Sequence, residues 1–284
     1  MGRPDGRESR ILSTTTVRVS SEARTVAIAV ASTLVVVALV AIGITQTPGW
    51  DEFRAYFFDW ELYRESFPEI SRAFLVNVKL FLIAEAIILP AALLLAVLRG
   101  LPGPVFFPVR VLAVVYSDLF RGVPTILVIF MLGFGMPALG VSWVPIDPFF
   151  WAVVALVLVY TAYVSEVYRA GIESVHPSQE AAARSLGLTR FQALRHVVLP
   201  QAVRRVIPPL LNDFIGLQKD TALVAVLGVV EAFRQTQINQ SANFNGTYNL
   251  VAATLFVLIT IPLARFTDWL VARDRRRRQA GRLA

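Results

Sequence analysis

Six stretches of the sequence are long, apolar and almost free of charge, and they constrain the fold more than any other feature. A helix needs about 20 mainly apolar residues to cross about 30 Å of hydrocarbon. Lipid offers no hydrogen-bonding partners to the backbone, so such segments cross as helices. Only 17% of the residues are charged, whereas soluble domains carry about 25%. We therefore predict an all-α, polytopic membrane protein with spans at 26–45, 73–98, 110–135, 149–165, 207–230 and 248–264.

The first and fifth spans differ from the others. Residues 26–45 are too long for the apolar core of a signal peptide, and no small-residue cleavage site follows at once, so we expect a retained helix. Residues 207–230 form the weakest span, because prolines and charges interrupt them. The expected organisation is an N-terminal tail (1–25), an additional membrane helix (26–45), an external segment (46–73), a five-helix membrane domain (74–272) and a basic tail (273–284).

The basic residues predict the orientation. With six spans, both tails and two loops lie on one side and hold 20 basic residues, whereas the opposite loops hold four: Arg54, Arg64, Arg72 and Arg234. Short loops rich in arginine stay on the cytoplasmic side. Both termini are therefore predicted to be cytoplasmic. The basic cluster at 273–278 is expected to lie against anionic lipid rather than to bind nucleic acid.

The external segment 46–73 holds six acidic residues against three arginines, together with several aromatic side chains. Phe53, Phe57 and Trp60 share one face if the segment is a single helix. An interfacial helix with an aromatic belt is the first interpretation. Docking of an external partner is the alternative.

The sequence offers little for metal binding or covalent catalysis. It has no cysteine and only two histidines, His176 and His196. This excludes thiolate chemistry and makes a histidine-based metal site or catalytic triad improbable on composition. A membrane-embedded enzyme is accordingly disfavoured.

The loop at 172–200 has the pattern of two short helices joined by a glycine. Ser178 is the expected N-cap, Gly187 the expected C′ residue, and Thr189 with Gln192 a capping box. The consecutive alanines 181–183 give a smooth helix surface that allows close backbone approach, and Glu180 adds a charge near the N-terminus. Such a helix suits a partner's groove. An ordinary cytoplasmic hairpin is the alternative.

Glu180-Ala181-Ala182, Gly187 and the Leu-Pro at 199–200 together resemble the EAA loop of bacterial ABC-importer permeases. Further segments resemble the permeases for polar amino acids, of the histidine, glutamine and glutamate type. They occur in the family's order and cover roughly 74–273: FRGVP at 120–124, EVYRAGI at 166–172, LPQA at 199–202, PPL at 208–210, KDT at 219–221 and GVVE at 228–231. Residues 1–73 lie outside the resemblance.

The resemblance implies one transmembrane half of an importer. Two permease subunits, alike or different, would pair, and two ATPase subunits would each receive an EAA helix through Glu180, Ala181, Ala182 and Gly187. A solute-binding protein would deliver a polar amino acid from outside. The chain has no phosphate-binding loop of the G-x-x-x-x-G-K-[ST] type, so ATP and magnesium would be used by the partner ATPases and no cofactor would be bound directly.

Ionisable residues inside spans are costly and are functional candidates. Asp118 and Arg121 are three residues apart, so we expect either an ion pair that fixes the helix or a place on the substrate path. Lys219-Asp220 interrupts the fifth span beside Thr221, and a broken helix there would line the path. A local salt bridge that closes the break is the alternative, although adjacent residues on a continuous helix diverge.

Glu85 matches no charged family position, and Asp213 stands where the family usually has an amide. These two acids are candidates either for tuning the transporter toward a cationic substrate or for pairing with Lys219 or Arg121. A different small solute, such as an amine or organic acid, would keep the transporter class. A membrane scaffold that recruits ATPases is the hypothesis from another class.

Overall fold

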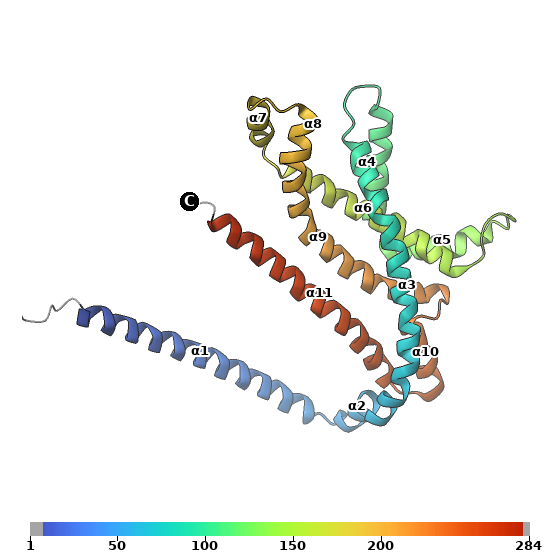
Figure 1. Ribbon diagram of the computed structural model, residues 1–284. Helices are drawn as coiled ribbons and strands as arrows, with labels where there is room; N and C mark the ends of the chain where they lie inside the picture. The colour runs from blue at the N-terminus through green and yellow to red at the C-terminus, as the bar shows by residue number, and fades with distance from the viewer. Residues whose placement is uncertain (1–7, 281–284) are drawn as a thin grey trace, which may run out of the picture. The chain divides into compact units, whose positions relative to one another are not determined.

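The computed structural model describes residues 8–280, which form helices and connecting turns (Figure 1). The chain divides into two compact units at Phe58 and Asp59. The first holds α1 (Glu8–Thr45) and α2 (Trp50–Phe57). Between Arg24 and Thr45, α1 is long and apolar enough to cross a membrane, and its side chains there are exposed. A helix that is apolar all round and has no protein packing is suited to lipid.

The second unit contains the remaining helices. They are α3 (Trp60–Arg99), α4 (Phe107–Gly122), α5 (Thr125–Ala138), α6 (Pro148–Glu173), α7 (Pro177–Ser185), α8 (Arg190–Ala193), η1 (Leu194–Val198), α9 (Leu199–Asp220), η2 (Thr221–Leu227), α10 (Ala232–Asn243) and α11 (Thr247–Ala280). Because α2 ends at Phe57 and Asp59 caps α3, Trp60 does not share a helix with Phe53 and Phe57, contrary to the sequence expectation.

α6 is the central helix of this unit. It packs against α3, α4, α5 and α9, and its buried residues include Ala152, Ala155 and Ala162. α3 contributes Ala84 and Ala92 to the same core. Small side chains let helix backbones approach closely, which is how helices associate in lipid where apolar burial gives no advantage.

The expected third span is bent. Residues 110–135 were predicted as one span, but α4 and α5 meet at an angle of 103°. Pro124 cannot donate a backbone hydrogen bond, and Val123 before it is extended with ψ 130°. The two helices together still pass as one broken span, but they do not form a single helix. Hydropathy does not reveal such a bend, because it reports how apolar each half is and not the direction in which its helix runs.

α9 changes its helix type rather than breaking at its prolines. Pro208 and Pro209 lie inside α9, and the α-helix continues to Asp220. The 3₁₀ helix η2 follows and ends at Gly228, whose φ of 82° favours glycine. Among the described residues, four helices pass as membrane spans by length and composition, and the α4–α5 pair makes a fifth; α9 is not among them.

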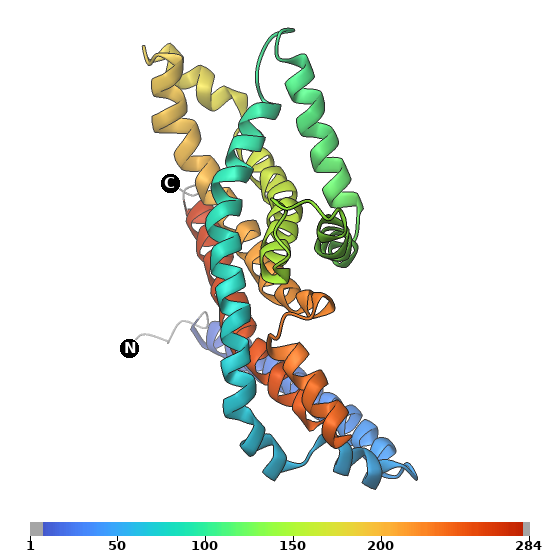
Figure 2. The ribbon, with the colours of Figure 1, turned by 90° about the vertical axis from the view of Figure 1, so that its right-hand side faces the viewer.

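Opposite ends of the second unit carry different elements (Figure 2). α7 and α8 lie at the same end as the α3–α4 connection. α10 lies at the other end, where the starts of α3 and α11 pack around Ile70, Phe74, Tyr248 and Val251. With its 40 residues, α3 is about 60 Å long, so it exceeds the hydrocarbon thickness.

Candidate functional site

The first half of the site is α7, a short helix with well-defined ends. Its N-cap is His176, whose ring nitrogen Nδ1 accepts a hydrogen bond of 3.2 Å from the Ser178 backbone N–H. Ser178 is therefore not the N-cap, because Pro177 already occupies the first helical position, which suits proline. Gly187 is confirmed as the C′ residue, with φ 88°.

The turn after α7 is a Schellman motif. The Gly187 N–H donates to Arg184 O at 3.0 Å and the Leu188 N–H to Ala183 O at 3.3 Å. The capping box at Thr189 and Gln192 is also confirmed. Glu180 reaches Arg190 across the turn, with 3.8 Å between Oε1 and Nε. The two short helices are thus held in one hairpin.

One face of this hairpin is packed and the other is free. Ala183 is buried, and Val175, Val198 and Ala202 form a small core at the base of the hairpin. Ala181 and Ala182 are exposed. Leu186 is 82% exposed and Phe191 68% exposed, so two large apolar side chains accompany the alanine face. An exposed apolar surface of this kind is a candidate binding surface for another protein.

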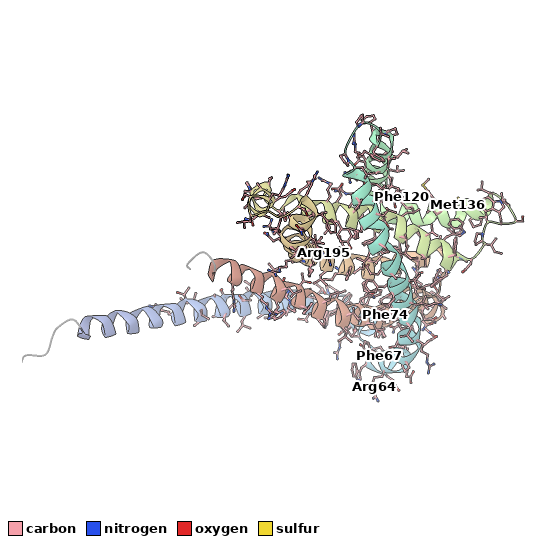
Figure 3. All side chains as sticks on the ribbon, turned by 45° about the horizontal axis from the view of Figure 1, so that its top comes forward. Arg64, Phe67, Phe74, Phe120, Met136 and Arg195 are labelled. Carbon is pink, nitrogen blue, oxygen red and sulfur yellow. The ribbon has the colours of Figure 1, made fainter. Side chains whose placement is uncertain are left out.

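The segment that follows α8 contains a π-helical turn, in which the Leu199 N–H donates to Leu194 O. Pro200 lacks the N–H that a regular α-helix would use here, so the change of register comes just before it. In Figure 3, Arg195 is labelled on this segment, whereas Phe67 and Phe74 are labelled on α3. α8, the π-helical turn and α9 therefore follow one another as a continuous helical segment.

Asp118 and Arg121 do not form the predicted ion pair. Arg121 Nη1 lies 3.5 Å from Glu166 Oε1 on α6, and among the described side chains Asp118 makes no salt bridge. Arg99 contacts the same Glu166 oxygen, and Arg169 Nη2 lies 2.8 Å from Oε2. Sequence analysis missed this cluster. The signal available in the sequence was the single acid Glu166 near the end of an apolar span, together with arginines near the ends of the neighbouring spans.

Lys219, Asp220 and Thr221 have separate surroundings. Lys219 is exposed. Asp220 Oδ2 accepts a hydrogen bond of 3.0 Å from the Tyr160 hydroxyl on α6, and the Thr125 side chain at the start of α5 also hydrogen-bonds to this carboxylate. Thr221 is fully buried and accepts a hydrogen bond from Asn77 Nδ2 at 3.1 Å. Asp220 therefore connects the α4–α5 bend with the end of α9.

Asn77 is the centre of a buried network that sequence analysis also missed. Its Nδ2 donates to Glu231 Oε2 at 2.9 Å, and its Oδ1 accepts from the Ala232 N–H at 3.1 Å. Glu231 caps α10 by accepting from the Phe233 and Arg234 N–H groups. Burial raises the pKa of the Glu231 carboxyl, and these hydrogen bonds oppose that rise. The network ties α3 to α10.

Glu85 and Asp213 lie close enough to interact electrostatically, on α3 and α9. Glu85 is only 8% exposed. Its Oε1 and the Oδ2 of Asp213 are buried without a hydrogen-bond partner. Neither acid pairs with Lys219 or Arg121 in the part of the chain that the structure describes.

Residues 88–277 match the family model for the binding-protein-dependent transport system inner membrane component. The probable amino-acid permease protein YxeN of Bacillus subtilis (strain 168) is 36% identical over 205 residues, which cover 72% of this chain and 90% of that protein. The glutamine transport system permease protein GlnP of Escherichia coli (strain K12) is 37% identical over 147 residues, which cover 52% and 67% respectively.

A solved structure of an amino acid ABC transporter with histidines has a similar fold. It superimposes with a TM-score of 0.69 at 30% identity, covering 76% of this chain and 98% of that one. The family-model match at 88–277 includes the hairpin of α7 and α8 and overlaps most of the resemblance found at 74–273. The chain therefore belongs to the family of inner membrane components of binding-protein-dependent transport systems.

Proposed function

We propose that the chain is the transmembrane subunit of an ATP-driven importer and forms the translocation path for a polar amino acid. The relatives named for amino-acid and glutamine transport support this substrate class. The observation that carries the proposal is the hairpin of α7 and α8, which presents an exposed alanine face beside two exposed apolar side chains. The protein is a multi-pass component of the inner membrane.

The hairpin is the proposed coupling element. Ala181 and Ala182 allow close approach of an ATPase subunit, and Glu180 holds α7 to α8 through Arg190. Gly187 ends α7 sharply in a conformation that other residues rarely adopt. ATP hydrolysis, with its magnesium, takes place on separate ATPase subunits. Two such subunits and a second permease copy or paralogue complete the membrane assembly, and an external solute-binding protein delivers the substrate.

The proposed topology has six spans and both termini in the cytoplasm. In this arrangement α9 with η2 crosses as the fifth span of the chain, which is the fourth of the core, although it carries more charge than the others. The twenty-to-four distribution of basic residues supports the orientation. Because the sequence has no cysteine, single-cysteine variants report the topology directly. Ser185→Cys on α7 should react with an impermeant maleimide only in opened vesicles, and Ser241→Cys on α10 in intact cells.

The proposed path runs past the interrupted end of α9. Lys219 is exposed there, Asp220 and Thr221 hold the junction of α9 with η2, and Arg121 and Asp118 lie on α4 before the bend. A junction between helix types leaves backbone groups that bind zwitterionic solutes.

Uptake by the assembled transporter tests the function. The permease, its ATPase and its binding protein are reconstituted in liposomes, and radiolabelled amino acids are supplied with the binding protein outside and ATP inside. We expect ATP-dependent accumulation of one or a few polar amino acids. Assembly with the ATPase but no accumulation of any amino acid would overturn the proposal, and the scaffold hypothesis would then stand.

A further inference from the structure

The acids Glu85 and Asp213 form no salt bridge with any residue that the structure describes. The acid Glu166, by contrast, is paired with three cations, Arg99, Arg121 and Arg169. Lys79 lies over the Phe149 ring, with Nζ 5.0 Å from its centroid. Glu85 and Asp213 instead each retain a buried oxygen without a hydrogen-bond donor.

Three helices bring these acids together. Phe81 on α3 and Phe214 on α9 contact each other with ring centroids 6.2 Å apart, so Glu85, one turn along α3, lies beside the stretch of α9 that carries Asp213. α6 packs against both helices. From α6, Tyr168 interacts electrostatically with Glu85, and Tyr160 with Asp213. Two tyrosines of α6 therefore lie near the two carboxyls, and one of them, Tyr160, also donates a hydrogen bond to Asp220.

Such a cluster disfavours anions and attracts cations. Two neighbouring carboxyls repel each other when both are charged, and burial makes each charge costly unless a cation compensates it. An ionised residue left unpaired within a membrane span is a functional candidate. An ammonium or guanidinium group supplies several N–H donors to carboxylate oxygens, and tyrosine rings attract the same cations.

We propose that Glu85 and Asp213 bind the positively charged side chain of the transported solute, so that the substrate is a basic amino acid. This inference rests on the proposed function and narrows its substrate class. Glu85 is 8% exposed and Asp213 is partly buried, so both carboxyls are largely withdrawn from the surface of the bundle.

The test compares substrates in the complete transporter. The wild type should accumulate radiolabelled arginine or lysine more than glutamine or glutamate. Glu85→Gln and Asp213→Asn should each lower arginine uptake by about tenfold or more, because each removes a charge-assisted hydrogen bond. Asp268→Asn is the matched control, since Asp268 is exposed and pairs only with Arg265 in the described structure. This variant should keep full uptake.

A binding measurement distinguishes arginine binding by the permease from arginine binding by the solute-binding protein. Radiolabelled arginine is added to the purified permease–ATPase complex without binding protein, and retention is measured by scintillation proximity. We expect retention by the wild type and by Asp213→Glu, and loss in Glu85→Gln and Asp213→Asn. Co-purification of the ATPase should be equal in all variants.

Three results would overturn the inference. The first is a wild type that accumulates glutamine or glutamate but neither retains nor accumulates basic amino acids, which leaves the importer function intact. The second is unchanged arginine uptake in Glu85→Gln and Asp213→Asn. The third is loss of ATPase co-purification in both variants, which would give the acids a structural role. Failure to accumulate any amino acid would instead contradict the proposed function itself.

Discussion

Arg99 on α3 and Arg121 on α4 contact the same carboxylate oxygen of Glu166 on α6, so one acidic group joins three helices near the end that carries α7. Arg169, one turn further along α6, binds the second oxygen of Glu166. The side chains of Arg99 and Glu166 are mostly buried, at 12% and 16% exposure. The cluster is therefore screened from water more than a surface ion pair is.

Replacing Glu166 with glutamine should destabilise the bundle. The change leaves the mostly buried Arg99 without its counter-charge, and an incompletely buried polar group left without its partner costs about 1–3 kcal/mol. Thermal unfolding of the detergent-purified protein measures the loss. Glu173→Gln is the control, because Glu173 is exposed and binds only Arg169 in the described structure. An exposed pair contributes about 1 kcal/mol at most. Equal melting temperatures for the two variants would contradict the role given to Glu166.

Gly171 tests the packing of α6 against α9. A Cβ added to Gly171 would collide with the Val206 side chain. Overpacking of this kind costs about 1–3 kcal/mol, so Gly171→Ala should lower the unfolding temperature. Gly135→Ala is the matched control, because a Cβ on Gly135 in α5 meets no atom within 4 Å. That variant should be as stable as the wild type or slightly more stable. A stable Gly171→Ala protein would mean that α6 and α9 are packed more loosely.

Ala182→Trp should prevent association with the ATPase. Ala182 is exposed on the face of α7 that we assign to the ATPase groove, and an indole there blocks close approach. The permease itself should fold normally, since the side chain faces away from its core. Co-purification with the ATPase measures the effect, and Ala242→Trp on exposed α10 is the control. Retained co-purification of Ala182→Trp would remove α7 from the interface.

Lys219→Ala should impair transport more than assembly. Lys219 is exposed and makes no salt bridge within the described residues, so its loss should leave the fold intact. Loss of one charge-assisted contact with the solute lowers uptake roughly tenfold. Uptake normalised to the amount of assembled transporter is the measurement, and Arg265→Ala, another exposed cation, is the control. Wild-type uptake by Lys219→Ala would exclude Lys219 from the path.

The sequence predicts the features that depend on local chemistry. The apolar stretches predict an all-helical membrane protein, and Gly187 and the Thr189–Gln192 capping box predict the turn of the hairpin correctly. Each of these follows from a few adjacent residues whose conformational preferences agree. The N-cap is misplaced by two residues, because Pro177 suits the first helical position and His176 replaces the usual capping residue.

The features that the sequence did not predict depend on the direction in which a helix runs and on contacts between residues far apart in the sequence. Hydropathy reports how apolar the residues on each side of Val123-Pro124 are and not the direction of their helices, so it does not show that α5 turns away from α4. Helical spacing pairs Asp118 with Arg121, but the acid that Arg121 contacts lies 45 positions away at Glu166. Asn77 likewise finds Glu231 at a separation of 154 residues. Pairings of this kind are set by the packing of helices and not by sequence spacing.

The hydrogen bonds of Asp220 have a consequence for motion. This carboxylate binds Tyr160 of α6 and Thr125, the first residue after the sharp turn out of α4. Asp220 is also the last residue before α9 passes into η2. The side chain of Asp220 therefore connects two irregular points of the backbone, the α4–α5 bend and the end of α9. If α9 slid by a single turn, about 5.4 Å, both contacts would break in the same event. The bend at Pro124 and the junction of α9 with η2 at Asp220 would then become free to move at the same time.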